Sequence, residues 1–224
     1  MAGLHVYAIV PAGHAPPAGL TGIGDGAVAM IAAGPIALWA ATLPERPAAT
    51  VDAARLHNDV IRAAMTPTVT PVPARFGQWF DTEDEARRKL AADEARWLAD
   101  LARFAGRAEF GIRVSGQVAD AAAAQLVHDA PTGTGYMKAL ARRHAESQRR
   151  AQEGERIAGA LAAAAGPIVA ETRVQATPDG VAIANLVAWT DESPYHTAVR
   201  GEAARNPALR FLFTGPWPPY SFVD

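Results

Sequence analysis

The residues that could carry chemistry in this chain are its histidines and carboxylates, because the sequence contains no cysteine. That absence excludes disulfides, thiolate metal sites and cysteine nucleophiles. His57, His128 and His196 are candidate general bases, but no partner group accompanies any of them at a catalytic spacing. The HExxH, Walker A and nucleophile-elbow motifs are absent as well. The sequence therefore predicts no enzyme and no catalytic, cofactor-binding or metal-binding residue.

A short motif, Arg75-Phe76-Gly77, follows a proline-rich stretch and precedes a helix start. Arg75 is a candidate to present its guanidinium to a carboxylate of a partner protein, and Phe76 to anchor a hydrophobic contact. The alternative is purely structural. Arg75 would then pair with a local carboxylate such as Asp81 or Glu83, and Gly77 would only permit a turn.

The C-terminal segment 214–222 combines three prolines with three aromatic residues. Because proline fixes φ and removes a backbone donor, the segment is predicted to be extended and rigid, outside regular structure. Trp217, Tyr220 and Phe222 can each bury a large apolar area. These side chains either pack against the chain itself or bind a partner, and both alternatives stay open at the level of sequence.

A long predicted helix over residues 136–165 carries more basic than acidic side chains. One interpretation is a surface for acidic partners, and the other is a solvated face with pairs such as Glu146 with Arg150. His144 falls on the apolar stripe of this helix and is expected to be a core histidine. The basic residues are Lys138, Arg142, Arg143, Arg149, Arg150 and Arg156.

The elements that position these residues follow from hydrophobic periodicity and from helix caps. Thr50 is a predicted N-cap, and Thr82 with Glu85 has the capping-box spacing. In the first half we expect a strand over residues 4–10, a hairpin of strands 27–33 and 36–42, and a helix from the Thr50 cap to about residue 65. A proline-broken edge strand over residues 68–75 and a helix over residues 82–105 are expected to follow.

After Gly106 the pattern begins afresh, with alternation typical of a half-buried strand. We expect strand 108–115, helix 136–165, strands 168–176 and 181–189 around a Pro178-Asp179-Gly180 turn, a helix capped by Ser193, and strand 209–213. The order β-α-β-β-α-β is that of a ferredoxin-like fold, an antiparallel sheet with both helices on one face. We therefore predict an α+β protein of two domains, residues 1–106 and 107–224, the second ending in the aromatic tail.

The composition limits the classes of partner. The chain has 224 residues, of which 21 are basic and 23 are acidic. Half of all its residues are hydrophobic. A net charge of −2 gives no general attraction to nucleic acid or to an anionic membrane. No signal peptide and no stretch of about 20 apolar residues stands out. A soluble protein of the cytoplasm is therefore expected.

Three segments together resemble the GvpL/GvpF family of gas vesicle proteins. Pro71-Val72-Pro73-Ala74-Arg75-Phe76-Gly77 is similar to the family's PxRFG segment. Leu4-His5-Val6-Tyr7 resembles its opening strand, and Gly215-Pro216-Trp217-Pro218-Pro219-Tyr220 its C-terminal signature. The resemblance spans residues 4 to 223 in the right order. Ala74 stands where a larger apolar residue is expected, and residues 117–135 match nothing in the family.

This resemblance implies a non-enzymatic accessory role in building gas vesicles, hollow shells assembled from the small hydrophobic protein GvpA. Members are thought to bind GvpA and other accessory proteins, and their second domain is described as a modified ferredoxin-like fold. It implies a protein of the gas vesicle and cytoplasm. An alternative is an RNA-binding module of the same ferredoxin-like order, of which Phe110-Gly111-Ile112-Arg113-Val114 is a loose imitation.

Overall fold

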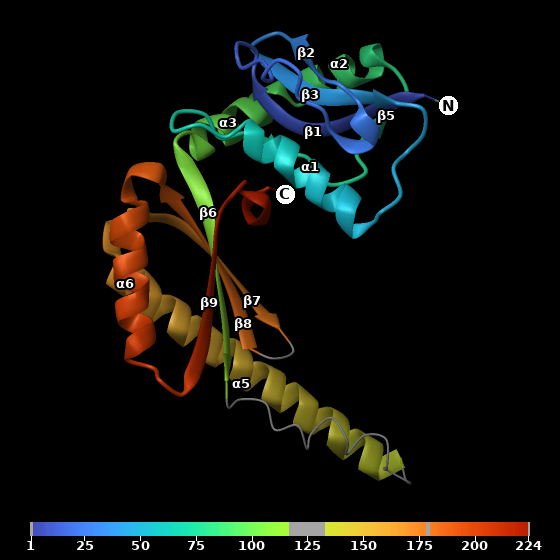
Figure 1. Cartoon of the computed structure of the whole chain (residues 1–224). Coiled ribbons are helices and arrows are strands. Elements are labelled where there is room, and N and C mark those ends of the chain that lie inside the picture. Colours follow the sequence, from blue (N-terminus) through green and yellow to red (C-terminus); the bar gives the residue numbers. More distant parts are fainter. Residues whose placement is uncertain (1, 117–132, 178–179, 224) are drawn as a thin grey trace. The chain divides into compact units, whose positions relative to one another are not determined.

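Two compact units make up the chain in the computed structural model (Figure 1). The structure describes residues 2–116, 133–177 and 180–223. Unit 1 comprises residues 1–108 together with 216–224, and unit 2 comprises residues 109–215. The main difference from the domains expected from sequence is the C-terminal tail, which belongs to unit 1 and not to the second unit.

Unit 1 is built on an antiparallel sheet. Its strands are β1 (Gly3–Pro11), β2 (Val28–Ala33), β3 (Ile36–Leu43), β4 (Val72–Pro73) and β5 (Trp79–Phe80). The order is β2-β3-β1-β4, and β5 also pairs with β1, beyond β4 along the same edge. The predicted hairpin is confirmed. Gly34, with φ 64°, opens its two-residue turn, as a tight hairpin turn requires. Of the predicted strand 68–75 only Val72–Pro73 pairs, because proline cannot extend the ladder.

Three helices complete unit 1, namely α1 (Val51–Ala63), α2 (Glu83–Ala92) and α3 (Glu94–Phe104). The Thr50 hydroxyl accepts from the Ala53 N–H, and the Thr82 hydroxyl accepts from the Glu85 N–H, so both predicted caps are confirmed. The prediction of one continuous helix over residues 82–105 was wrong. Asp93 leaves the helical conformation (φ −112°, ψ 20°) and separates α2 from α3. Aspartate competes with the helix by bonding to nearby backbone, which favours such breaks.

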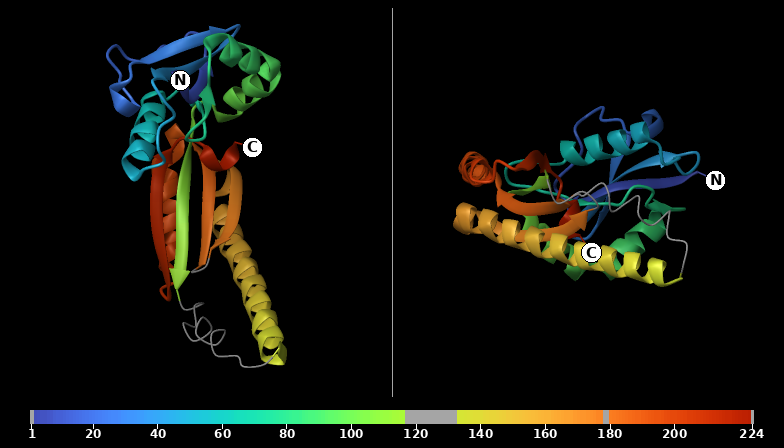
Figure 2. Two further views of the ribbon diagram at one scale, coloured as in Figure 1. Left: turned by 90° about the vertical axis from the view of Figure 1, so that its right-hand side faces the viewer. Right: turned by 90° about the horizontal axis from the view of Figure 1, so that it is seen from below.

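Helices cover both faces of this sheet (Figure 2). On one face α1 packs Val60 and Ile61 against Tyr7 and Trp39, all almost fully buried. On the other face α2 and α3 bury Leu90, Leu101 and Phe104. Burying one such side chain contributes about 1.5–3 kcal/mol, so β1, which is buried from Gly3 to Val10, gains stability from both faces.

Unit 2 holds a second sheet and two helices. Its elements are β6 (Arg107–Gly116), α5 (Gly133–Ala165), β7 (Val169–Thr177), β8 (Gly180–Ala188), α6 (Glu192–Ala204) and β9 (Leu209–Trp217), with short 3-10 turns at 166–168 and 189–191. The strand order is β7-β8-β6-β9. Helices α5 and α6 pack on each other and on one face of the sheet. The predicted turn at Pro178-Asp179 lies outside the described residues.

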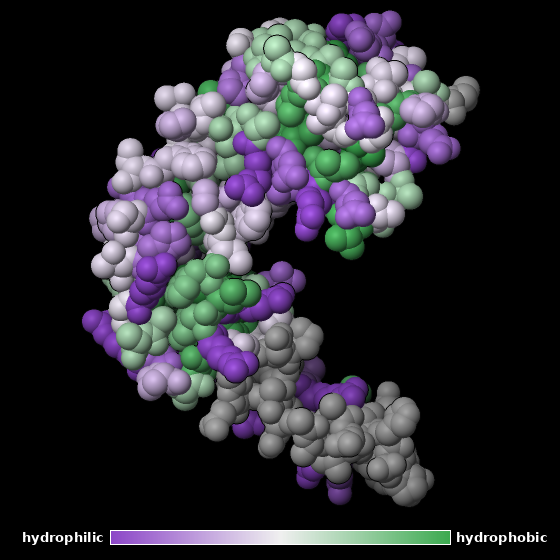
Figure 3. All heavy atoms as spheres, in the orientation of Figure 1, coloured by the Kyte–Doolittle hydropathy of each residue, from purple (hydrophilic) through white to green (hydrophobic). Residues whose placement is uncertain are grey.

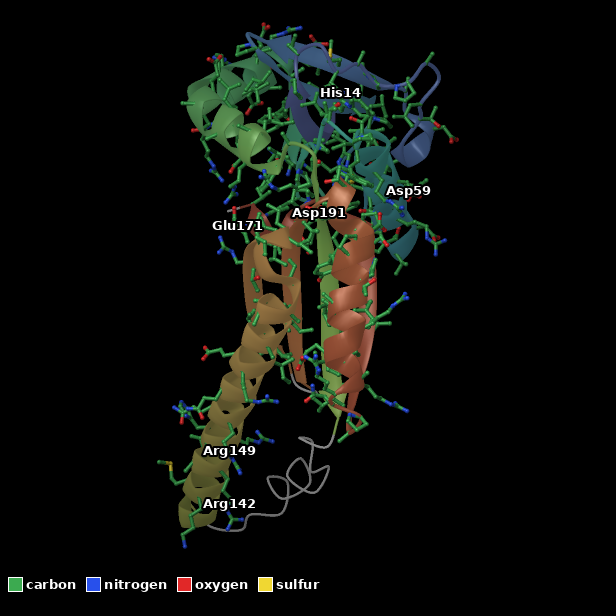
Figure 4. All side chains as sticks on the ribbon, turned by 90° about the vertical axis from the view of Figure 1, so that its left-hand side faces the viewer. His14, Asp59, Arg142, Arg149, Glu171 and Asp191 are labelled. Carbon is green, nitrogen blue, oxygen red and sulfur yellow. The ribbon has the colours of Figure 1, made fainter. Side chains whose placement is uncertain are left out.

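Helix α5 is only partly packed. Its last third buries Ile157 and Leu161, whereas Met137 and Leu140 are 63% and 49% exposed. His144 is exposed too, so the expectation of a core histidine was wrong. The helix runs past the end of the sheet (Figure 4), and its earlier turns therefore find no sheet to pack on. The labelled Arg142 and Arg149 lie on this projecting part.

Two further boundaries differ from the expectation. Helix α6 begins at Glu192, and its N-cap Asp191 makes no side-chain cap bond, so Ser193 is not the cap. Strand β9 continues to Trp217, and residues 220–222 form a 3-10 turn, so the segment after residue 213 is not irregular throughout. An edge strand tolerates Pro216 because one side of the strand needs no donor. Apolar side chains gather over the strands of unit 2, beside hydrophilic ones (Figure 3). Among the described residues no helix is long and apolar enough to cross a membrane.

Candidate functional site

The Arg75-Phe76-Gly77 motif forms a tight turn between β4 and β5. The Gln78 N–H donates to the Arg75 carbonyl at 3.1 Å, and Gly77 has a φ of 84°. A type II turn requires such a positive φ at its third position, which glycine adopts without strain. The motif therefore joins two short strands that both pair with β1, and its backbone is held on both sides.

The guanidinium of Arg75 is left exposed by this turn. Neither of the expected local carboxylates forms an ion pair with Arg75. Asp81 accepts a hydrogen bond from the Trp79 indole at 3.0 Å, and Glu83 pairs with Arg87 at 2.7 Å. Within the described part of the chain, no ion pair of Arg75 is present. The structure thus keeps the functional alternative open for Arg75 and gives no support to the local pairing.

Phe76 belongs to a buried aromatic cluster, which we call the histidine cluster. Its members are His5, Tyr7, His57 and Phe76, with ring centroids 4.9 to 5.7 Å apart in edge and tilted contacts. Such contacts contribute beyond the area they bury. Phe76 is half-buried and packs on both histidines. The motif is therefore anchored by Phe76 to the opening strand and to α1.

The hydrogen bonds of the cluster fix the tautomers of both histidines. His57 Nε2 lies 3.0 Å from the Ala74 carbonyl, so it must carry the proton and donate. His57 Nδ1 is then an acceptor, and His5 Nε2 donates to it at 2.9 Å. His5 Nδ1 is left buried without a hydrogen-bond partner. This pattern is the one for neutral rings. A proton added at His57 Nδ1 would make that nitrogen a donor and would remove the bond that it accepts from His5.

Burial opposes charge at this cluster. Desolvation, helped by the neighbouring His57, lowers the pKa of His5 to about 4. Desolvation also lowers the pKa of His57, against the smaller opposite effect of its bond to Ala74. The pKa of Tyr7 is raised by burial, although its hydroxyl accepts from the Ile23 N–H. A pair of neutral histidines without solvent access is suited to packing and not to proton transfer with a substrate.

Trp217 and Tyr220 lie against α1. The Arg62 guanidinium sits 5.1 Å from the Trp217 ring centre, a cation–π contact. The Tyr220 hydroxyl donates to Asn58 Oδ1 at 3.3 Å. Trp217 is half-buried and Tyr220 is 38% exposed. Of the two, Tyr220 offers more surface to a partner.

Phe222 is fully packed inside unit 1. Its side chain is 1% exposed, and its carbonyl accepts a hydrogen bond from Arg103 Nη2 at 2.6 Å. Arg103 also pairs with Asp100 at 3.0 Å, which orients the guanidinium. Of the two alternatives left by the sequence, the structure shows the first: the tail packs on the chain itself. The ring of Phe222 is buried by that packing.

One pocket of about 190 Å³ opens beside the motif on the other face of the unit 1 sheet. Its walls are mostly apolar, with Gln78, Lys89 and Asp93 as polar groups. Pockets for small-molecule ligands measure about 300–1,000 Å³. This pocket is too small for a substrate of that kind, and it is suited at most to one side chain. It is lined by Ile9, Leu38, Gln78, Phe80, Ala86, Lys89, Leu90, Asp93 and Trp97.

The histidines considered as general bases are not brought into one site. His57 is buried in the histidine cluster, while His196, in the other unit, lies 3.8 Å from Glu192 and packs on Phe110. His128 lies outside the described residues. Across the part of the chain that the structure describes, no group of three His, Cys, Asp or Glu side chains could hold a metal ion.

Strand β6 does not form the exposed aromatic platform that an RNA-binding module needs. Phe110, Ile112 and Val114 are buried, and the ring of Phe110 packs against Tyr195 of α6. Proteins of that class stack bases on exposed aromatic side chains of the central strands. Nothing in β6 therefore favours the RNA-binding alternative.

Sequence reasoning missed the histidine cluster and β5. The signal for His5 was its place in an apolar strand that is buried on both faces, where a polar side chain needs a partner. The partner, His57, is 52 positions away, so no local pattern connects the two.

Comparisons with known proteins all point to one family. The model of the family described as "Gas vesicle synthesis protein GvpL/GvpF" matches residues 3–224. The gas vesicle protein L of Streptomyces sp. (strain CB03234) is 32% identical over 193 residues, which is 77% of this chain and 69% of that protein.

Two crystal structures of gas vesicle protein GvpF share the fold. The protein from Anabaena sp. PCC7120 has a TM-score of 0.79 and covers all of this chain and 97% of its own. The protein from Microcystis aeruginosa has a TM-score of 0.74 and covers 98% of both chains. Each is 19% identical to this chain, a level at which the likeness shows the fold alone.

Proposed function

Because the chain belongs to the GvpL/GvpF family of gas vesicle synthesis proteins, we propose that it acts in gas vesicle assembly as a non-enzymatic accessory protein. In this role it binds the shell protein GvpA and other vesicle proteins in the cytoplasm or on the vesicle. The observation that carries the proposal is the family match over residues 3–224. GvpA as the partner is our inference from the family resemblance, since the printed names of the matched proteins state no partner.

The geometry supports a contact role for the Arg75-Phe76-Gly77 turn. The turn is backed by the histidine cluster and presents an exposed guanidinium. Arginine pairs with carboxylates in a fixed bidentate geometry, and a rigid support reduces the entropy lost on binding. Tyr220 is the exposed member of the tail. We propose Arg75 and Tyr220 as direct contacts, and Phe76, Trp217 and Phe222 as the residues that hold them in place.

Unit 2 is interpreted as a ferredoxin-like domain. Its described elements follow one another as strand, helix, two strands, helix and strand, and the sheet order β7-β8-β6-β9 places the first and third strands at the centre. This fold hosts many unrelated functions and by itself indicates none of them.

Co-purification tests the proposal. A tagged wild-type chain is expected to capture co-expressed GvpA or another vesicle protein, and Arg75→Glu is expected to weaken that capture at least tenfold by placing like charges together. Arg55→Glu is the matched control, since Arg55 is also exposed in unit 1 and the charge change is the same. Capture of no vesicle protein by the folded wild-type chain would overturn the binding role. Equal losses for both variants would remove Arg75 from the interface.

A further inference from the structure

Strand β2 is an open edge of the unit 1 sheet. Beyond it in the order β2-β3-β1-β4 there is no further strand (Figure 2). The Val28 N–H points away from β3 and donates to the Leu20 carbonyl at 2.9 Å. Since alternate residues of a strand point the same way, the N–H and C=O groups of Met30 and Ala32 also point outward. Among the described residues these four groups have no hydrogen-bond partner.

The composition of β2 distinguishes it from the other edges. Its sequence, Val-Ala-Met-Ile-Ala-Ala, contains no charge and no proline. Proteins normally protect edge strands with charged side chains, with proline or by keeping them very short. The opposite edge of this sheet consists of the two-residue strands β4 and β5, and Pro73 lies in β4.

The edges of the unit 2 sheet are protected as well. Strand β7 carries Glu171 and Arg173, and β9 carries Arg210 and Pro216. Strand β2 therefore stands apart as an edge without any of these devices. The proline-broken stretch that contains β4 offers no comparable edge, because Val72 and Pro73 are buried.

We propose that β2 is a docking strand, which extends the unit 1 sheet by pairing with an uncharged apolar strand of a vesicle protein. Unpaired backbone groups at a sheet edge are satisfied by another extended segment, and pairing of this kind supplies affinity through main-chain hydrogen bonds. Because β2 itself carries no charged side chain, it offers no ion pair to a charged strand and favours an apolar one. The inference rests on the proposed function, which takes a small hydrophobic shell protein as the partner.

The test replaces one backbone donor at the edge. Ala32→Pro removes an outward N–H that the fold does not use, so unit 1 is expected to stay folded while capture of co-expressed GvpA falls at least tenfold. Ala32→Thr keeps the N–H at the same position and is expected to bind within about twofold of wild type. Amide hydrogen exchange supplies a second readout: Met30 and Ala32 become protected in the complex, whereas Val28 is already bonded and changes little.

The outcomes are distinguishable. Capture by the wild type that Ala32→Pro leaves unchanged, with no new protection at Met30 and Ala32, overturns the docking strand but not the proposed function. Protection that rises with the concentration of the chain alone would show that a second copy occupies the edge, and would overturn the partner assigned here. Absence of capture by the wild type is a failure of the proposed function itself.

Discussion

Replacing Phe222 with alanine is expected to lower the free energy of unfolding of unit 1 by about 3–5 kcal/mol. The ring is 1% exposed, so its removal leaves a cavity in the packing that ties the tail to unit 1. That loss is a large share of the 5–15 kcal/mol that stabilises a typical domain. Denaturant unfolding followed by tryptophan fluorescence measures it, because Trp39, Trp79, Trp97 and Trp217 report on unit 1.

Tyr220→Ala is the matched control within the same tail. Tyr220 is 38% exposed, and its hydroxyl donates a hydrogen bond to Asn58, so its loss is expected to cost less than that of the buried Phe222, about 1.5 kcal/mol. If Phe222→Ala left the unfolding midpoint unchanged while reducing capture of a vesicle protein, the tail would be a partner-binding segment and the packing of Phe222 on unit 1 would be contradicted.

Acidification is expected to destabilise unit 1 through the histidine cluster. The pKa of His5 is about 4 in the folded chain and 6.5 in the unfolded chain. Below pH 6.5 the unfolded chain therefore binds a proton that the folded chain does not. The stability from His5 is complete above about pH 6.5 and is lost progressively as the pH falls toward 4. At pH 5 this amounts to roughly 2 kcal/mol, and His57 acts in the same direction.

The variant His5→Gln isolates this effect, because glutamine keeps a donor for His57 but does not titrate. Its stability loss between pH 7.5 and pH 5 is expected to be about 2 kcal/mol smaller than that of the wild type. His144→Gln makes the same substitution at an exposed histidine outside the cluster and is the matched control. Parallel profiles for the wild type and His5→Gln would contradict the neutral, buried pair.

Much of the fold could be predicted from local signals. The caps at Thr50 and Thr82 and the hairpin at Gly34-Pro35 depend on neighbours within a few residues, and the structure places them as expected. The turn at Gly77 is also a local feature, because the positive φ at this position favours glycine. The family resemblance likewise depended on short motifs in order, and the match over residues 3–224 confirms it.

The rest depends on contacts between distant residues. The bond between His5 and His57 joins positions 52 apart, and Arg103 bonds the carbonyl of Phe222, 119 positions away. Periodicity also cannot show where a helix leaves its sheet, which is why His144 was placed in a core that α5 does not have at that point. The candidate contact residues were found by type, whereas their supports became visible only in three dimensions.

Vesicle formation in a host that carries the other vesicle genes but lacks this one tests the central claim most directly. The account predicts that such cells form few or no gas vesicles, counted by electron microscopy and by flotation, and that the wild-type gene restores them. Normal numbers of intact vesicles without the gene would contradict a role in assembly.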